Sequence, residues 1–176
     1  MPRRLLSRLA QGAGAGAYLP AHGGIGVAVA QQALFATLLD EAIDATGADK
    51  GTLQLLDRSV NGLRVVASRG FDAPFLRFFA TVRVEDACVC GYALRQAGRV
   101  IVPNVTTSEI FKGAPSLEVL RNAGIRSVQA TPIFSRGRAL LGVISTHWTS
   151  EHQPSVEELA RLDAVVLRAA RQIASG

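Results

Sequence analysis

The sequence predicts one mixed α/β domain of the α+β type, built on an antiparallel sheet with terminal helices on one face. Three observations predict it. Strand-like segments occur as a pair after the first helix and as a second pair before the last helix, and residues 69–126 between the pairs are mostly helical in pattern. A crossover of that length can cover the second face of the sheet, so we expect it to enclose a pocket there.

The first helix and hairpin follow from periodicity and turn signals. Apolar side chains recur at helical spacing from Gln31 to Ile43, and Gly47 is a natural helix end. Residues 51–57 alternate apolar and polar side chains as a strand does, and the Asn61-Gly62 turn returns the chain as a second strand over residues 63–68.

The crossover is predicted to contain three helices and a short strand. Four phenylalanines fall within residues 71–79, which favours a short aromatic helix. Asp86 is placed to cap a helix that ends at Gly98, and residues 100–103 form the strand. Pro115 begins a further helix, which ends at Gly124.

The second hairpin, residues 127–134 and 139–147, alternates small or apolar side chains with neutral polar ones. Solvent faces of sheets usually carry charge, so a neutral polar face indicates a surface that is covered yet lined with hydrogen-bonding groups. An ordinary solvated face that lacks charge by chance is the alternative. The pocket hypothesis assigns to one enclosed face the side chains of Thr52, Gln54, Gln129, Thr131, Ser145 and His147.

The last helix has a clear start and a regular apolar seam. Ser155 and Glu158 form a capping box after Pro154. The seam predicts packing on the sheet, and we also expect a homodimer through the first and last helices. Its members, at spacings of three and four, are Leu159, Leu162, Val166, Ala169 and Ile173.

Composition narrows the class of protein. The 176 residues suffice for one domain, predicted over 31–176, after a flexible Gly/Ala-rich tail over 1–30. The net charge is +5, but its arginines are scattered, which favours a solvated surface over nucleic-acid binding. No apolar run approaches the ~20 residues of a membrane span. The two cysteines are too few for a disulfide framework, which favours a reducing compartment. We therefore expect a cytoplasmic protein.

Several phrases of the chain form a recognisable set: TGADKG and QLLD within residues 46–57, RGFDAPFL at 69–76, CGYAL at 90–94, VQATP at 128–132 and LGVISTH at 141–147. Over residues 31–174 the chain resembles the GAF domain, especially the modules that accompany bacterial histidine kinases and other signalling proteins. The resemblance implies a non-catalytic sensor of a small, mostly neutral molecule that signals through its terminal helices. Its ligand or cofactor is unidentified, and its partner would be a histidine kinase or another signalling protein.

This chain matches only in part the residues that known GAF functions use. Positions matching those of cyclic-nucleotide-binding members are Thr52, Phe71, Asp72 and Ser145, without a full signature. Bilin-binding members attach the pigment through a cysteine followed by histidine, and neither cysteine here has that neighbour. Val89-Cys90-Gly91 is similar to free methionine-R-sulfoxide reductases, but the loop that carries their catalytic cysteine, residues 104–114 here, has none.

Individual candidates follow from this expected placement. Cys90 should lie in the first turn of its helix, where the helix N-terminus favours a thiolate; a small buried hydrophobe is the alternative. His147 is a pocket donor or a structural histidine, and Phe75 or Phe111 is expected at the pocket rim. The predicted ligand-binding set is Thr52, Gln54, Phe71, Phe75, Cys90, Phe111, Gln129, Thr131, Ser145 and His147.

No catalytic residue and no metal site are predicted, because no nucleophile–base pair and no ligand cluster stand out. Three functions remain open at this point. The chain is a small-molecule sensor, an enzyme of the free methionine-R-sulfoxide reductase type, or a pure dimerisation module without a ligand.

Overall fold

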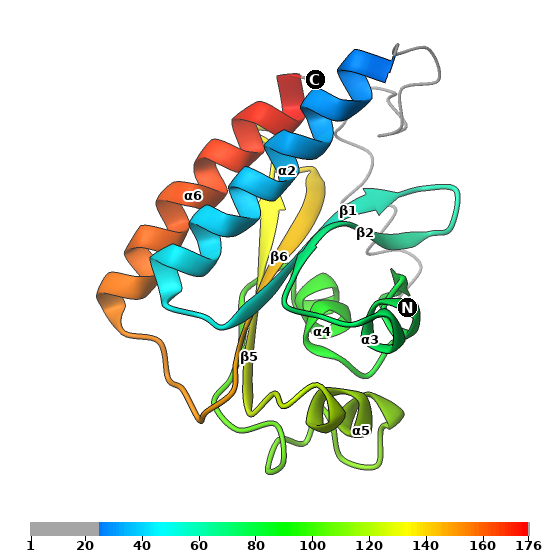
Figure 1. Ribbon diagram of the computed structural model, residues 1–176, viewed down its shortest axis with the longest axis vertical. Coiled ribbons are helices and arrows are strands. Elements are labelled where there is room, and N and C mark those ends of the chain that lie inside the picture. The colour runs from blue at the N-terminus through cyan, green and yellow to red at the C-terminus, as the bar shows by residue number, and fades with distance from the viewer. Residues whose placement is uncertain (1–24, 176) are drawn as a thin grey trace.

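The computed structural model describes residues 25–175. Six strands form one antiparallel sheet in the order β3-β2-β1-β6-β5-β4 (Figure 1), which confirms the predicted fold class. The strands are β1 (Lys50–Asp57), β2 (Gly62–Arg69), β3 (Thr81–Val82), β4 (Val100–Val102), β5 (Ser127–Phe134) and β6 (Leu140–Trp148). The helices are α2 (Ile25–Thr46), α3 (Ala73–Phe78), α4 (Val89–Gln96), α5 (Pro115–Asn122) and α6 (Val156–Ser175).

Helices α2 and α6 lie side by side over one face of the sheet (Figure 1). The apolar side chains between them and the sheet come from both helices and from alternate positions of β1 and β6; they include Phe35, Leu38, Leu39, Ile43, Leu53, Leu55, Ile144, Leu162, Val165 and Ile173. α2 begins at Ile25, earlier than the expected start at Gln31. Residues 1–24 of the predicted tail lie outside the described part of the chain.

The capping box at the start of α6 is confirmed. The backbone N–H of Ser155 donates to Glu158 Oε2 at 2.6 Å, and the N–H of Glu158 donates to Ser155 Oγ at 3.2 Å. Further along, Arg168 pairs with Glu41, and Arg161 Nε donates to the carbonyl of Ala45 at 2.9 Å. These contacts join α6 to α2 as one helical layer.

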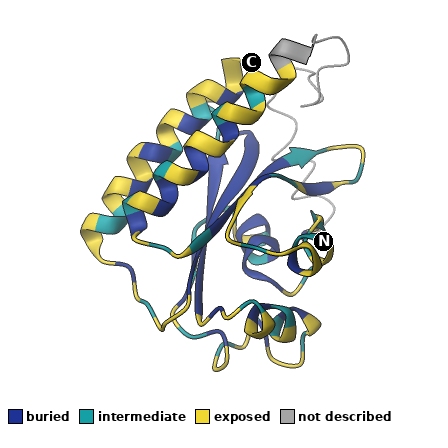
Figure 2. Cartoon of the chain, viewed as in Figure 1, coloured by how far each residue is buried: buried dark blue, intermediate teal, exposed yellow. Residues whose placement is uncertain are grey.

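The crossover of α3, β3, α4, β4 and α5 covers the opposite face, and a second apolar core fills the space between them. Both faces of the central strands are therefore covered, and Figure 2 shows β5 and β6 buried along nearly their whole length. Within residues 25–175, no helix combines the length and the apolar character that crossing a membrane requires.

Asp86 does not cap α4, so that expectation is wrong. Cys88 is the N-cap residue, while Asp86 Oδ2 accepts the backbone N–H of Arg83 at 2.7 Å. The carboxylate therefore stabilises a tight turn before the helix. That turn packs closely on the first turn of α4, because a Cβ at Gly91 would lie 2.3 Å from the carbonyl oxygen of Asp86.

The prediction that Gln129 and Thr131 of β5 face the crossover is also wrong. Gln129 pairs directly with Thr146, and Thr131 with Ile144. Directly opposed residues share a face of the sheet, and Ile144 belongs to the core under α2 and α6. Gln129 and Thr131 therefore face α6 and not the crossover. Arg99 bridges to the same side, since it donates to Thr131 Oγ1 and pairs with Asp163 of α6.

Candidate functional site

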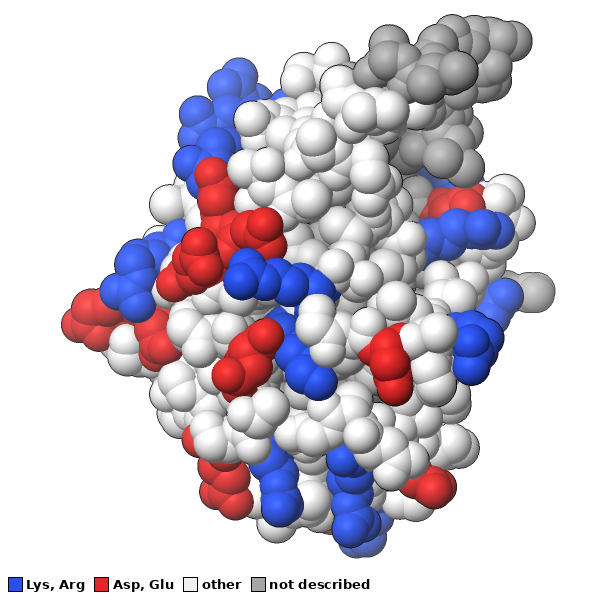
Figure 3. Space-filling view, in the orientation of Figure 1, with Lys and Arg blue, Asp and Glu red and all other residues white. Residues whose placement is uncertain are grey.

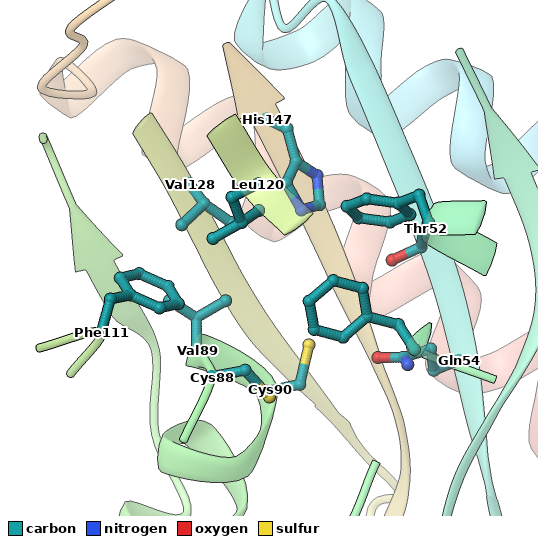
Figure 4. A pocket seen from close by; sticks show the side chains of 11 residues that line it. Thr52, Gln54, Cys88, Val89, Cys90, Phe111, Leu120, Val128 and His147 are labelled. Atoms are coloured by element: carbon teal, nitrogen blue, oxygen red, sulfur yellow. The ribbon is translucent and has the colours of Figure 1, made fainter. Parts of the chain in front are cut away.

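A cavity lies between the sheet and the crossover (Figure 4). Strands β1, β5 and β6 contribute one wall, and α3, the start of α4, the segment before α5 and α5 itself contribute the other. We call it the inner cavity. Its lining consists of Thr52, Gln54, Phe75, Phe79, Cys88, Val89, Cys90, Phe111, Leu120, Val128 and His147. The centre of a water molecule can reach about 20 Å³ of it, which is room for one or two waters.

The structure brings most of the candidate residues to this cavity. Six of them line it: Thr52, Gln54, Phe75, Cys90, Phe111 and His147. Phe71 and Ser145 lie just behind the lining. The Phe71 ring stacks on Phe75 at 3.7 Å between centroids, and Ser145 Oγ lies 3.0 Å from Cys90 Sγ. Gln129 and Thr131 are on the far side of the sheet.

Sequence reasoning missed five lining residues: Phe79, Cys88, Val89, Leu120 and Val128. Four of them are apolar, and their pattern is that of ordinary core. Cys88 is 5% exposed, although its position before α4 suggested an accessible loop residue. The one sequence signal that Cys88 lines the cavity was its position two residues before Cys90.

His147 is held as a neutral imidazole. Burial, and then the nearby charge of Lys50, lower its pKa from 6.5 to about 3. The backbone of Lys50 opposes this shift of the pKa, and Nδ1 makes no hydrogen bond with any described residue. Nδ1 is therefore an unpartnered polar atom at the cavity wall, which donates or accepts according to the tautomer.

Gln54 supplies an unpartnered acceptor. Its side chain is 2% exposed, and Oε1 makes no hydrogen bond with any described residue. Thr52 and Gln54 of β1 and His147 of β6 line the pocket that Figure 4 shows. The inner cavity thus has a mostly apolar lining with two unpartnered polar atoms, Gln54 Oε1 and His147 Nδ1.

Burial keeps both thiols protonated. It raises the pKa of Cys88 to about 11 and raises the pKa of Cys90 still further, with Cys88 as the next cause for Cys90. Cys90 does lie in the first turn of α4, but desolvation outweighs the helix N-terminus there. Of the two interpretations of Cys90, burial favours the small buried hydrophobe over the thiolate, and the thiol contacts Ser145.

Aromatic rings close the cavity on the side of α3. Phe75 lies 4.7 Å from Phe79, and Phe71 contacts the edge of His147 at 4.9 Å between centroids. Lys50 Nζ lies 5.5 Å from the Phe71 ring and donates to the carbonyl of Ala123 at 2.8 Å. Lys50 thereby joins β1 to the end of α5 across the aromatic group.

Among residues 25–175, no group of three or more His, Cys, Asp and Glu side chains is arranged to hold a metal ion. Figure 3 shows basic and acidic side chains interspersed over the viewed face. The chemistry that this site offers is recognition by shape and by hydrogen bonds.

These features define a mixed α/β module with a cavity enclosed between its sheet and its crossover. The GAF domain family model matches residues 30–173, and the chain belongs to this family. GAF domains commonly serve as sensory or regulatory modules. No curated protein matches the sequence.

Solved structures share the fold at low sequence identity. A domain assigned to a two-component sensor histidine kinase protein from Sinorhizobium meliloti 1021 is 19% identical, with a TM-score of 0.64, covering 86% of this chain and 92% of that one. The GAF domain of a phosphoenolpyruvate-protein phosphotransferase from Coxiella burnetii is 16% identical, with a TM-score of 0.68 and coverage of 99% and 93%. A type II free methionine-R-sulfoxide reductase from Thermoplasma acidophilum is 14% identical, with a TM-score of 0.65 and coverage of 84% and 94%.

Proposed function

We propose that this GAF domain is a non-catalytic sensor that binds a small molecule in the inner cavity and signals through α2 and α6. The observation that carries the proposal is the pair of buried, unpartnered polar atoms at one cavity, Gln54 Oε1 and His147 Nδ1. A buried polar atom without a partner costs about 1–3 kcal/mol. A ligand that donates a hydrogen bond to Gln54 and forms one with His147 would recover that cost, which favours ligand binding over an apolar filler.

The chemistry of the lining sets the kind of ligand. No ionised side chain lines the inner cavity, because His147 is neutral and both thiols are protonated. The buried part of the ligand is therefore uncharged, apolar over most of its surface, and carries hydrogen-bond donors. Since the cavity has room for only one or two waters, binding requires the crossover to shift.

The sheet supplies a route from the cavity to the terminal helices. On β1, Thr52 and Gln54 face the cavity, while the alternate residues Leu53 and Leu55 pack under α2 and α6. A displacement of β1 therefore reaches both faces, and helices packed at an interface can convert a small shift into a change of association.

The proposed assembly is a homodimer through α2 and α6, in the cytoplasm, acting on a signalling partner such as a histidine kinase. Val29 on α2 and Leu167 on α6 are 64% and 60% exposed, and burying them between two copies would stabilise the dimer. Light scattering checks this part of the proposal. Wild-type protein should elute as a dimer and Leu167→Glu as a monomer, while a monomeric wild type at high concentration contradicts it.

The reductase alternative is less well supported. Its chemistry needs an attacking thiolate and a second thiol that can reach it, but both thiols here are buried and protonated. Residues 104–114 also contain no cysteine. Reduction of free methionine sulfoxide by the purified chain, lost in Cys90→Ser, would overturn the non-catalytic proposal.

Native mass spectrometry tests ligand binding directly. Protein purified under mild conditions should carry an additional small-molecule mass, which denaturing conditions release. The same preparation of Gln54→Met should lack it. If wild-type protein carries no such mass and gains no thermal stability from a metabolite extract of its expression host, the sensor proposal fails and a dimerisation module without a ligand is favoured.

A further inference from the structure

A second, larger hollow adjoins the inner cavity. It lies between α3, β3 and the beginnings of α4 and α5, and water centres can reach about 360 Å³ of it. We call it the outer hollow. Its lining consists of Phe78, Phe79, Thr81, Val82, Arg83, Asp86, Ala87, Cys88, Ala114, Pro115 and Ser116.

The inner cavity and the outer hollow share two side chains. Phe79 and Cys88 line both, so the wall between the two spaces is one side chain thick at these residues. Phe79 is the C-cap residue of α3, and Cys88 is the N-cap residue of α4. The wall therefore lies at the end of α3 and the start of α4. At such positions helix packing constrains side chains least.

Phe79 has room to move. Its ring packs against the core on one side, with centroid distances of 4.7 Å to Phe75 and 4.8 Å to Phe78, and lines the outer hollow on the other side. Phe79 is only half-buried, and Phe78 beside it is 45% exposed. A change of rotamer toward the hollow would remove the ring from the wall without displacing the fully buried core.

We propose that the inner cavity and the outer hollow are the two ends of one ligand site, divided by Phe79 and Cys88, and that Phe79 moves aside to admit the ligand. This inference rests on the proposed function and deepens it. The inner cavity alone holds one or two waters, whereas the two spaces together reach the size of small-molecule sites, about 300–1,000 Å³.

The two ends recognise different chemical groups. At the inner end, Gln54 Oε1 needs a donor and His147 Nδ1 needs a hydrogen-bond partner. At the outer end, Asp86 Oδ2 already accepts the N–H of Arg83, while the Arg83 guanidinium forms no ion pair with a described residue. The site therefore suits a flat amphiphilic molecule with N–H or O–H donors at its buried end and an anionic group at the end near Arg83.

Thiol alkylation tests the gate without any ligand. The described residues contain two cysteines, both buried, so the rate at which N-ethylmaleimide modifies Cys88 reports how often the wall opens. Phe79→Ala should raise the Cys88 rate about tenfold or more, and Phe79→Leu by less. Phe134→Ala is the matched control, because Phe134 is also a half-buried phenylalanine packed against the same core but lies outside both linings, and its Cys88 rate should equal that of the wild type.

Cys90 distinguishes gating from unfolding. Gate opening exposes Cys88 ahead of Cys90, whereas global unfolding modifies both at equal rates, so the ratio of the two should rise in Phe79→Ala. Equal Cys88 rates in Phe79→Ala and wild type, or equal acceleration in Phe134→Ala, would overturn the gate. Because this assay needs no ligand, a positive result together with a failed native mass spectrum would refute the sensor function and leave the gate standing.

The ligand class is tested with 1-anilinonaphthalene-8-sulfonate, which combines a flat apolar body, an N–H donor and an anionic sulfonate. Its fluorescence should report binding that Arg83→Gln weakens about two- to fivefold, the range for one exposed ion pair. Arg77→Gln is the control, since Arg77 on α3 lies outside both linings. Equal binding by Arg83→Gln and wild type overturns the anionic end, and equal binding by Gln54→Met overturns the inner one.

Discussion

Replacing Gln54 by methionine should make the ligand-free domain more stable. The Gln54 side chain is 2% exposed and its Oε1 has no partner, an arrangement that costs about 1–3 kcal/mol. Methionine has nearly the same length and fits the same space without a polar atom, at a repacking cost below about 1.5 kcal/mol. The expected net gain is about 1 kcal/mol in the free energy of unfolding, or roughly 2–4 °C in Tm for a domain of this size.

The assay is urea denaturation of protein that has been unfolded and refolded to remove bound molecules. Gln129→Met is the matched control. Gln129 is also fully buried with an unpartnered Oε1, but it faces α6 and its Nε2 makes only a long 3.4 Å contact with Thr131. It should gain similar stability and keep the ligand mass that Gln54→Met loses. Destabilisation of Gln54→Met by 1 kcal/mol or more, about the value of one hydrogen bond, would refute the reasoning.

Three further results are expected. Gly142→Ala should destabilise the domain by about 3 kcal/mol in urea denaturation, because the new Cβ would lie 2.2 Å from the backbone oxygen of Gln54 and separate β1 from β6. Unchanged stability of this variant would contradict the expectation. Ser155→Ala should cost about 1 kcal/mol through loss of the capping box, measured in the same way against Ser175→Ala as a control. The lowered pKa of His147 means that the unfolded chain binds more protons below pH 6.5, so stability should fall between pH 7 and pH 5, and it should fall less steeply in His147→Phe.

Elements with strong local signals could be predicted from the sequence. α5 begins at Pro115 and is followed by Gly124, whose φ of +75° favours glycine, and the capping box fixes the start of α6. These signals act within a few residues, so they survive without knowledge of the fold. β3, with two residues, carries no periodicity that a sequence pattern could reveal.

The site was predictable only in part, since several of its properties depend on tertiary contacts. Gln129 and Thr131 were grouped with Thr52 and Gln54 by polarity, but the register of β5 against β6 decides which face they occupy. The position of Cys90 at a helix start was correct, whereas its burial depends on β6 and Ser145. Lining residues such as Val89 and Val128 have the same polarity as core residues, so only the packing distinguishes them.

The polar side of β5 has a consequence for how α6 can move. Beneath α6 the sheet presents Gln129, Thr131 and Thr146 in a row, where most sheets present branched apolar side chains. Interlocked apolar side chains resist sliding, because any displacement leaves gaps that cost contact energy. Hydroxyl and amide groups can exchange hydrogen-bond partners over a small displacement at little net cost. A small shift of α6 along β5 therefore loses less packing than it would over interlocked apolar side chains, while Arg99, which bridges Thr131 and Asp163, and the core residues Ile144, Leu162 and Ile173 hold α6 against the sheet.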